Sequence, residues 1–454
     1  MRPGFVVSAL RNPIARIGVA LTTASALLFL FLVAVHAAGY LQNPYTGLVV
    51  FLLVPALFIA GLLLIPVGLW FERRRVARGV SGPAWPRLDL NDPTIRRTVF
   101  VFMAATFVNL AIVSMASFGA VEYTESQGFC GQACHTVMEP EFVAHQSGTH
   151  SSVHCVTCHV GPGAGGFLTA KLNGTRQLWL AVTGSHSRPI PTPLERMPDV
   201  RTSCEQCHRP DRFVGDKVKV LYEHADDEAN TRTMTTVRLR VGGPISGTTT
   251  GSGIHWHMNR ANEVEYVALD HQREQIPYVR VATPDGRVRE YFAEGVTAGD
   301  VAGKPRRRMD CLDCHNRPAH RFSVSPEREV DGAIGAGQIS PKIPFIRRDA
   351  VRALRGEYAT QEIGLREIDR TIRAAVNVRQ PHPFEEADLR QAIAVTQSIY
   401  RRSVFPGMKV GWGTYPNQIG HTTSMGCFRC HDESHKTTEG LAIRQDCELC
   451  HTIE

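Results

Sequence analysis

The sequence has no excess of either charge outside its first 120 residues. Residues 1–120 contain ten arginines and three acidic residues, which account for the whole formal charge of +7. The rest of the chain is balanced, with 40 basic and 40 acidic residues. Proteins that bind nucleic acid carry a basic patch or stripe, so this balance gives no indication of nucleic acid as a partner.

The short loop Tyr40–Thr46 lacks lysine and arginine, and it separates two of three long apolar runs. The runs cover about Ile17–Ala38, Gly47–Trp70 and Thr98–Ala120, and each is long enough to cross a bilayer core. By contrast, seven arginines lie between Arg73 and Arg97. Cytoplasmic loops concentrate Lys and Arg. We therefore expect a multi-pass anchor in a bacterial cytoplasmic (inner) membrane, with the N-terminus and the arginine segment inside and the region after the third run in the periplasm.

The chain also lacks any spare cysteine. All twelve cysteines form six close pairs, each followed at once by a histidine. The six motifs are, in chain order, Cys130/Cys134/His135 (motif 1), Cys155/Cys158/His159 (motif 2), Cys204/Cys207/His208 (motif 3), Cys311/Cys314/His315 (motif 4), Cys427/Cys430/His431 (motif 5) and Cys447/Cys450/His451 (motif 6). Motifs 2 to 6 read Cys-x-x-Cys-His, the attachment sequence of c-type haem, and motif 1 has one extra residue. The pattern predicts six haems held by thioether bonds, with each motif histidine on the iron.

Two other uses of these cysteines are less consistent with the pattern. Zinc sites contain paired cysteines, but they do not place a histidine directly behind every second cysteine. Disulfides would leave the six histidines unexplained. Haem attachment takes place outside the cytoplasm, which agrees with the side of the membrane deduced from the arginines.

The membrane runs contain a single histidine, His36. A haem held between helices normally needs two ligands, so we expect none within the membrane. The predicted fold is a mainly α membrane anchor followed by a loop-rich multihaem cytochrome c domain in which haems form much of the core, with a small β insertion. The expected domains are the anchor (1–120), a first haem domain (121–208), a cysteine-free β insertion (209–310) and a C-terminal haem domain with amphipathic helices (311–454).

Secondary structure is indicated most clearly in the last two of these domains. Alternating patterns predict strands at Thr236–Val241 and Val264–Leu269, and a hairpin around Pro284-Asp285-Gly286. Helical spacing, with acidic residues early and arginines late, covers Asp349–Ala375 and Glu385–Arg402.

The stretch from Cys130 to His320 resembles the NapC/NirT family of membrane-anchored quinol dehydrogenases. The residues that carry the resemblance are FCGQACHTVMEPEF, the Ser147–His150 segment before CVTCHVGPG, Lys171-Leu172, and CLDCHNRPAH. Family members have one membrane helix and four haems, oxidise quinol at the outer face and pass electrons to soluble redox partners. With its extra spans, haems and β insertion, the whole layout is most similar to the inner-membrane multihaem quinol dehydrogenases of metal-respiring bacteria.

Each haem iron needs further axial ligands. The resemblance implies Met138 as a ligand at motif 1, and His150 and His320 as distal ligands elsewhere. From position alone, His421 and His435 flank motif 5, and either His255 or His257, in a glycine-rich loop, reaches back to a haem. The other histidines after the anchor are expected at the surface or in supporting positions; they are His145, His154, His186, His224, His271 and His382.

The resemblance also implies a quinol pocket lined by a lysine and an acid on an interfacial helix. Lys171 matches the lysine, whereas Gln177 stands at the position of the acid and cannot accept a proton. Glu122, Glu125 or a haem propionate would then take the proton. The expected function is quinol oxidation for periplasmic redox proteins or other membrane subunits, within a complex or a homo-oligomer. The alternatives are a haem wire in a larger membrane complex and a terminal reductase with an open haem iron.

Overall fold

A computed structural model of the chain describes residues 12–38, 46–77, 90–133, 135–194, 197–210, 213, 215–244, 251–259, 261–379 and 384–453. The chain divides into two compact units, Met1–Ala133 and Cys134–Glu454. Cys134, His382 and much of the arginine segment lie outside the described residues.

The first unit consists of three long helices, α2 (Pro13–Ala37), α4 (Val54–Ala77) and α5 (Pro93–Glu125). Stretches of these helices, Pro13–Val35, Thr46–Glu72 and Pro93–Glu125, are long and apolar enough to cross a membrane. The expectation of three spans is therefore confirmed in number and place. Each helix turns large apolar side chains outward, as lipid-facing helices do; Phe107 and Phe118 on α5 are 74% and 72% exposed.

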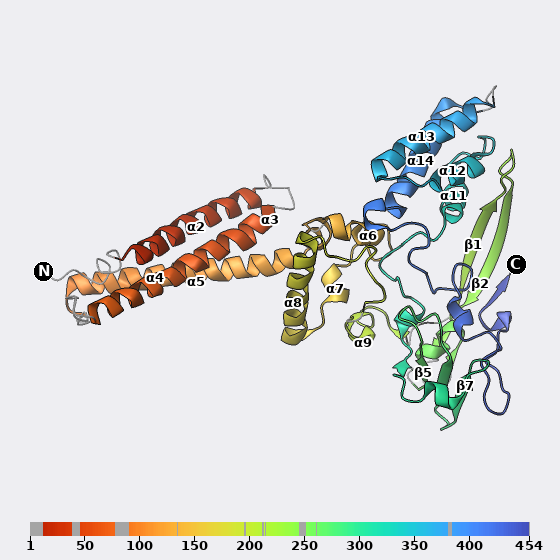
Figure 1. Cartoon of the computed structure of the whole chain (residues 1–454), viewed down its shortest axis with the longest axis horizontal. Helices are drawn as coiled ribbons and strands as arrows, with labels where there is room; N and C mark the ends of the chain where they lie inside the picture. The colour runs from red at the N-terminus through yellow and green to blue at the C-terminus, as the bar shows by residue number, and fades with distance from the viewer. Residues whose placement is uncertain are drawn as a thin grey trace. The chain divides into compact units, whose positions relative to one another are not determined.

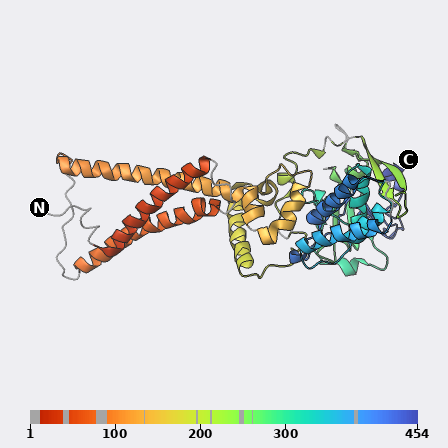
Figure 2. The ribbon, with the colours of Figure 1, turned by 90° about the horizontal axis from the view of Figure 1, so that it is seen from above.

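Glycines allow the spans to approach closely. Gly18 of α2 and Gly61 of α4 lie so near the facing backbone that a Cβ atom at either would be within 3 Å of it. Such small residues are typical of contacts between membrane helices. The last turns of α5 pack differently, since Tyr123 lies against Phe51 with ring centres 6.2 Å apart. Helices α2 and α4 pack against each other, and they cross in the view of Figure 2.

The second unit begins with four helices that carry or connect motifs 1 to 3. They are α6 (His135–Gln146), α7 (Cys155–His159), α8 (Gly163–Val182) and α9 (Val200–Ser203). Helix α8 has no buried residue, and its Leu168, Leu172 and Trp179 are 60%, 64% and 69% exposed. Because these three side chains recur at intervals of four and seven residues, they lie along one face of the helix.

The β insertion forms two antiparallel sheets and a short strand pair. One sheet has the order β1 (Asp216–His224), β2 (Arg232–Arg240) and β9 (His451–Ile453), so the end of the chain joins the insertion (Figure 1). The other has the order β7-β6-β5-β8; its strands are β5 (Glu263–Val267), β6 (Tyr278–Ala282), β7 (Val288–Phe292) and β8 (Arg307–Arg308). The predicted hairpin around Pro284-Asp285-Gly286 is confirmed by the pairing of β6 with β7.

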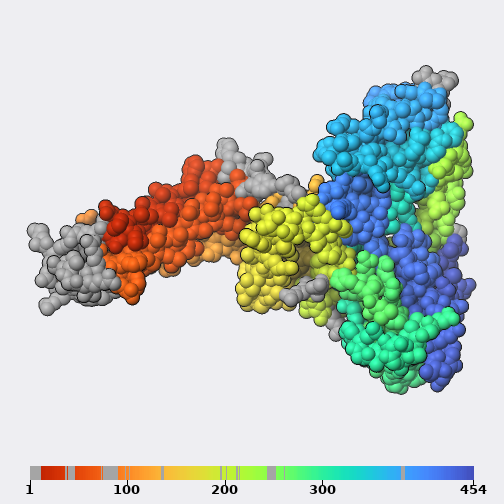
Figure 3. All heavy atoms as spheres, in the orientation of Figure 1, coloured from red at the N-terminus to blue at the C-terminus, as the bar shows by residue number. Residues whose placement is uncertain are grey.

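Four helices between motifs 4 and 5 build the largest apolar core among the described residues. They are α11 (Pro326–Gly335), α12 (Ile346–Leu354), α13 (Gln361–Asn377) and α14 (Glu386–Ser403), here called the helical module. Ile346, Ile368, Ile372 and Ile399 are fully buried in it. Figure 3 shows the module as one continuous cyan-to-blue block.

The structure corrects the predicted helix at Asp349–Ala375 in its extent. The chain leaves α12 after Leu354, and α13 begins only at Gln361. Thr360 caps the new helix, since its hydroxyl accepts a hydrogen bond from the amide of Ile363 at 3.3 Å. The predicted helix at Glu385–Arg402 corresponds to α14 within one residue at each end.

Hydrogen bonds and ion pairs between buried polar groups hold the β1–β2 hairpin against the helical module. Arg347 of α12 donates to Asp331 of α11 at 3.3 Å, and the same carboxylate faces the ring of His224 at the end of β1. The Asn230 side chain donates to the carbonyls of Pro341 and Ile343. Remaining short elements are α3 (Thr46–Leu48), η1 (Val49–Leu53), η2 (Phe129–Ala133), β3 (Gly243–Pro244), β4 (Gly251–Ser252), η4 (Ile254–Met258), α10 (Ala298–Val301), η5 (Cys311–Asp313), η6 (Pro406–Met408), η7 (Gly426–Arg429) and η8 (Cys447–Leu449).

Candidate functional site

Motifs 4, 5 and 6 each form a single 3₁₀ turn, and these turns are η5, η7 and η8. Aspartates placed just before two of them stabilise the start of the turn. The carboxylate of Asp310 accepts from the amide of Leu312 at 2.8 Å, and that of Asp446 accepts from Glu448 at 3.0 Å. A side chain that accepts an otherwise unpaired amide at a turn start is a local cap. None of the described cysteines forms a disulfide.

Five motif histidines each face one histidine from a distant part of the chain. The separations of the ring centres are narrowly distributed, from 5.8 to 6.2 Å. The pairs are His159 with His320 at 6.1 Å, His208 with His150 at 5.8 Å, His315 with His255 at 6.2 Å, His431 with His257 at 5.9 Å, and His451 with His421 at 6.0 Å.

This separation is compatible with a metal ion between two imidazoles, although the rings of His145 and His320, neither of which belongs to a motif, also lie 5.9 Å apart. Metal–nitrogen bonds of about 2 Å on each side put the two ring centres roughly 6 Å apart. Rings in direct stacking contact would lie closer, at about 4.5 Å or more for offset pairs. The residues therefore fit haem iron with two axial histidines, and the covalent link would come from the two cysteines beside each motif histidine.

Backbone carbonyls orient four of the five facing histidines. The Nδ1 atoms of these rings donate to the carbonyls of other residues at 2.9 to 3.1 Å. The four donor–acceptor pairs are His150 to Pro318, His320 to Glu141, His255 to Val241 and His257 to Ile254. A carbonyl can only accept, so Nδ1 carries the proton and Nε2 keeps its lone pair for the partner side. Metal-binding histidines are typically held by such a second hydrogen bond.

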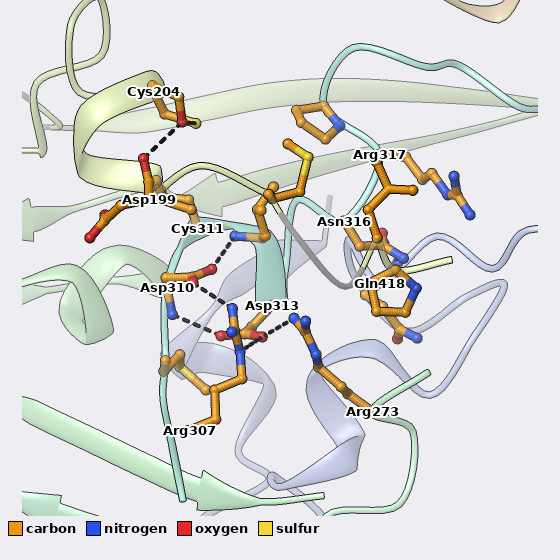
Figure 4. A pocket seen from close by; sticks show the side chains of 18 of the residues that line it. Asp199, Cys204, Arg273, Arg307, Asp310, Cys311, Asp313, Asn316, Arg317 and Gln418 are labelled. Atoms are coloured by element: carbon orange, nitrogen blue, oxygen red, sulfur yellow. Dashed lines mark hydrogen bonds and ion pairs between the residues drawn. The ribbon is translucent and has the colours of Figure 1, made fainter. Parts of the chain in front are cut away.

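A cavity of about 700 Å³ opens between motifs 2, 3, 4 and 5. Its walls include His159, Cys204, Cys311 and His320, together with polar residues from the loop after motif 4. Figure 4 shows Cys204 and Cys311 on opposite parts of this wall, with Arg273 and Arg307 both turned toward Asp313. A space of this size bounded by attachment cysteines suits a flat, largely apolar ring system.

Cys207, the second cysteine of motif 3, lies outside the described lining of this cavity. The motif should place both cysteines at one haem, yet Cys204 lines the cavity whereas Cys207 is exposed and is not part of the described wall. The amides of Cys207 and His208 both donate to the carbonyl of Cys204, at 3.2 and 2.9 Å. This tight turn gives the two cysteine side chains different surroundings. The cavity therefore accounts for Cys204 but not for Cys207, and thioether attachment at Cys207 stays a prediction.

Helix α5, the short segment after it and the first part of the second unit match a known family. Residues 93–190 match the NapC/NirT cytochrome c family, N-terminal region. The cytochrome c-type protein ImcH of Geobacter sulfurreducens is 42% identical over 448 residues, which cover 97% of this chain and 88% of that protein. The chain belongs to the NapC/NirT cytochrome c family. It is a membrane multihaem c-type cytochrome of that family. No solved structure matches it.

Within this NapC/NirT cytochrome, the structure brings together most of the predicted distal histidines and leaves one apart. His150, His320 and His421 each face a motif histidine, and so do both His255 and His257, where one had been expected. His435 faces none. Its Nδ1 lies 2.8 Å from the Asp432 carboxylate and its Nε2 lies 2.6 Å from the carbonyl of Ile276. Both ring nitrogens thus meet acceptors, and neither is left for an iron.

Motif 1 stands at the division between the two units of this NapC/NirT cytochrome. Cys130 belongs to η2 in the first unit, whereas His135 begins α6 in the second. Met138 follows on α6 and is half-buried. Cys134 and the side chain of His135 lie outside the described parts, so Met138 as the ligand at motif 1 stays a prediction.

The residues predicted for the quinol pocket come from both units. Glu122 and Glu125 lie in the last turns of α5, and Lys171 and Gln177 lie on α8. The ammonium of Lys171 lies 4.9 Å from the ring centre of Phe167, one turn earlier on α8. The pocket that these residues would form stays a prediction.

Sequence reasoning missed Glu141 of α6. Its carbonyl accepts from His320, and its carboxyl lies beside Tyr415, with 3.5 Å between Oε1 and the phenol oxygen. The other carboxyl oxygen has no hydrogen-bond partner within the described structure. Burial raises the pKa of Glu141 to about 7, against the opposing effect of Arg317. Only its place after motif 1, in FCGQACHTVMEPEF, could have drawn attention to it.

Proposed function

We propose that this protein is a six-haem membrane cytochrome that oxidises quinol at the periplasmic face of the cytoplasmic membrane and passes electrons to periplasmic redox partners. The observation that supports this most directly is the set of five histidine pairs at 5.8 to 6.2 Å. NapC/NirT proteins act in quinol-linked electron transfer, and the chain carries both the matched region and the membrane spans that this role needs. When bound, the haems supply one-electron uptake and release.

The proposed ligands differ from the first expectation at one position. We assign His320, His150, His255, His257 and His421 to motifs 2, 3, 4, 5 and 6, with Met138 kept for motif 1. His257 takes the place expected for His435. Two histidine ligands leave no open side on an iron, so this assignment favours electron transfer over a terminal reductase, which needs a site for its substrate.

Lys171 is the proposed quinol-binding cation. Quinol oxidation releases two electrons and two protons, so the pocket needs a group that stabilises the anion formed when the first proton leaves. An ammonium can donate a hydrogen bond to that oxygen, and Glu122 or Glu125 would accept the proton. The exposed apolar face of α8, with Lys171 and Arg176 at its borders, is typical of a helix that lies in the membrane interface, where quinol arrives.

The test mixes purified protein with a reduced quinol analogue and follows the haem absorbance. We expect the wild type to be reduced, and Lys171→Leu to be reduced at least tenfold more slowly while dithionite still reduces every haem. Arg176→Leu is the matched control, because it removes a cation from the same helix. If the wild type takes no electrons from any quinol analogue and yet is reduced readily by a partner subunit, a haem wire within a larger complex replaces this proposal.

The haem number is tested separately by mass. We expect the mature chain to exceed the apo mass by six haem masses, all retained on denaturation because the thioether bonds are covalent. A value of five would remove one motif from the attachment sites. Mapping haem-bearing peptides after proteolysis would show whether that motif is motif 1, and whether Cys207 is bonded to haem together with Cys204.

A further inference from the structure

Motifs 4 and 5 are joined through the residue that precedes the second cysteine in each. This residue is Asp313 in motif 4 and Arg429 in motif 5. Both side chains are buried, with 3% and 8% of their surface exposed. A buried charge is costly unless it is fully hydrogen-bonded, so the placement of both charges inside attachment motifs calls for a structural reason.

The guanidinium of Arg429 is satisfied entirely by backbone carbonyls. Its Nε donates to Gly426 at 2.8 Å, and one terminal nitrogen donates to the carbonyl of Arg273, also at 2.8 Å. The other terminal nitrogen donates to the carbonyl of Asp313. One side chain of motif 5 therefore holds the backbone of motif 4 and the loop before β6. Within the described residues, no carboxylate forms an ion pair with Arg429.

The carboxylate of Asp313 accepts hydrogen bonds from a second set of partners, on β5, on the loop before β6 and on β8. It accepts from Tyr266 at 2.6 Å, from Arg273 at 3.0 Å and from Arg307 at 3.2 Å, as Figure 4 shows for the two arginines. Arg273 has a positive φ of 59°, an unusual backbone conformation for a residue other than glycine. Its side chain is fixed by Asp313 and its carbonyl by Arg429, which explains how this conformation is held.

The histidines that face motifs 4 and 5 also come from one and the same turn. His255, which faces His315, and His257, which faces His431, stand two residues apart on the single turn η4. The same turn places the sulfur of Met258 3.8 Å from that of Cys311. Motifs 4 and 5 are thus tied to each other at the cysteine side by Arg429 and at the distal side by η4.

We propose that Arg429 is a positioning residue that holds the haem sites of motifs 4 and 5 as one rigid pair and raises the reduction potential of both haems. The proposal rests on haem attachment at these motifs, as set out under the proposed function. Reduction adds negative charge, and a buried cation stabilises the reduced form because the surrounding water and salt screen it little. The guanidiniums of Arg273 and Arg307 are paired with the carboxylates of Asp310 and Asp313, whereas Arg429 forms no ion pair with a carboxylate among the described residues.

The experiment is a spectroelectrochemical titration of the full-length, haem-loaded protein in detergent. In Arg429→Gln we expect two haems to become harder to reduce, with about a tenfold change in their oxidised-to-reduced ratio at fixed potential, or ~59 mV for a one-electron couple. Arg429→Lys, which keeps the charge, should retain potentials near those of the wild type. Asp313→Asn, which removes a negative charge from the same cluster, should shift the two haems in the opposite direction.

Arg289→Gln is the matched control, since it removes an exposed arginine from β7 and should leave the titration unchanged. Haem content is measured by mass first, which separates a loss of haem from a change of potential. The proposal is wrong if Arg429→Gln carries all its haems and titrates like the wild type. If that variant does not assemble, Asp313→Asn decides, and an unchanged or downward shift there overturns the proposal. Neither measurement uses quinol, so a failure of quinol oxidation leaves this test intact.

Discussion

At the scale of single residues, the surroundings of Nε2 distinguish His257 from His435. His257 and His435 are both buried or nearly so and both lie near motif 5 in space or sequence. His257 gives its Nδ1 proton to a carbonyl, and its ring centre lies 5.9 Å from that of His431. His435 meets acceptors at both nitrogens. The difference lies in what surrounds each ring, because the two side chains are chemically identical.

A ligand exchange tests this distinction. We expect His257→Met to raise the potential of one haem, because thioether ligation stabilises the reduced iron. His435→Gln, which keeps both hydrogen bonds possible, should leave all potentials unchanged. Redox titration of the two variants checks this, and a shift in His435→Gln with none in His257→Met would restore His435 to the ligand set.

Glu141 gives a pH-dependent contribution to stability. Its carboxyl titrates near 4.5 in a model peptide and near 7 in the folded chain, because burial raises the pKa. Between these values the folded chain holds a proton that the unfolded chain has released. The contribution of Glu141 to the free energy of unfolding is therefore fully present below about pH 4.5, and it is lost as the pH rises through 7.

Glu141→Gln has no proton to lose at this position. We expect its melting temperature, relative to the wild type, to increase between pH 5 and pH 8. Thermal unfolding followed by circular dichroism at the two pH values measures the difference. A constant offset between the two proteins would show that the carboxyl titrates alike in both states.

At the scale of elements, the helical module has the largest apolar core among the described residues of the second unit. Its helices are capped by Ser325 and Thr360 and bury isoleucines against one another. The module contains no attachment motif. Its stability should therefore respond to packing in the ordinary way and leave haem attachment unaffected.

Ile372→Ala tests this independence. The side chain is fully buried on α13, so its truncation should cost about 2 to 5 kcal/mol of unfolding free energy. Ile363→Ala, on the same helix but 36% exposed, should cost much less. Urea unfolding followed by circular dichroism compares the two, and haem content by mass should stay unchanged in both. Loss of haem in Ile372→Ala would show that the module supports attachment.

At the scale of the whole molecule, the arginines of the first unit predict its orientation. The N-terminus and the segment between Arg73 and Arg97 should be cytoplasmic. We expect a periplasm-dependent phosphatase fused after Arg78 to be inactive and the same enzyme fused after Glu454 to be active. An active fusion at Arg78 would contradict the proposed three-span orientation.

The fold could be predicted from the sequence wherever the signal was local. Apolar length gave the three spans, alternation around Pro284-Asp285-Gly286 gave the β6–β7 hairpin, and helical spacing gave α14. The predicted helix at Asp349–Ala375 failed in part, because the turn between Leu354 and Gln361 is required by packing in the module.

In the candidate site, too, the local features could be predicted from the sequence and the long-range contacts could not. The sequence by itself determined the six attachment motifs, because two cysteines and a histidine act within one turn of chain. The facing histidines come from far along the chain, as His257 does for His431, and only the tertiary structure decided these pairs. Nearness in sequence suggested His435, four residues beyond motif 5, yet the ring that faces His431 is that of His257, on η4. An iron ligand is selected by the direction and freedom of its Nε2 lone pair, and those depend on the carbonyls that the folded chain places behind the ring.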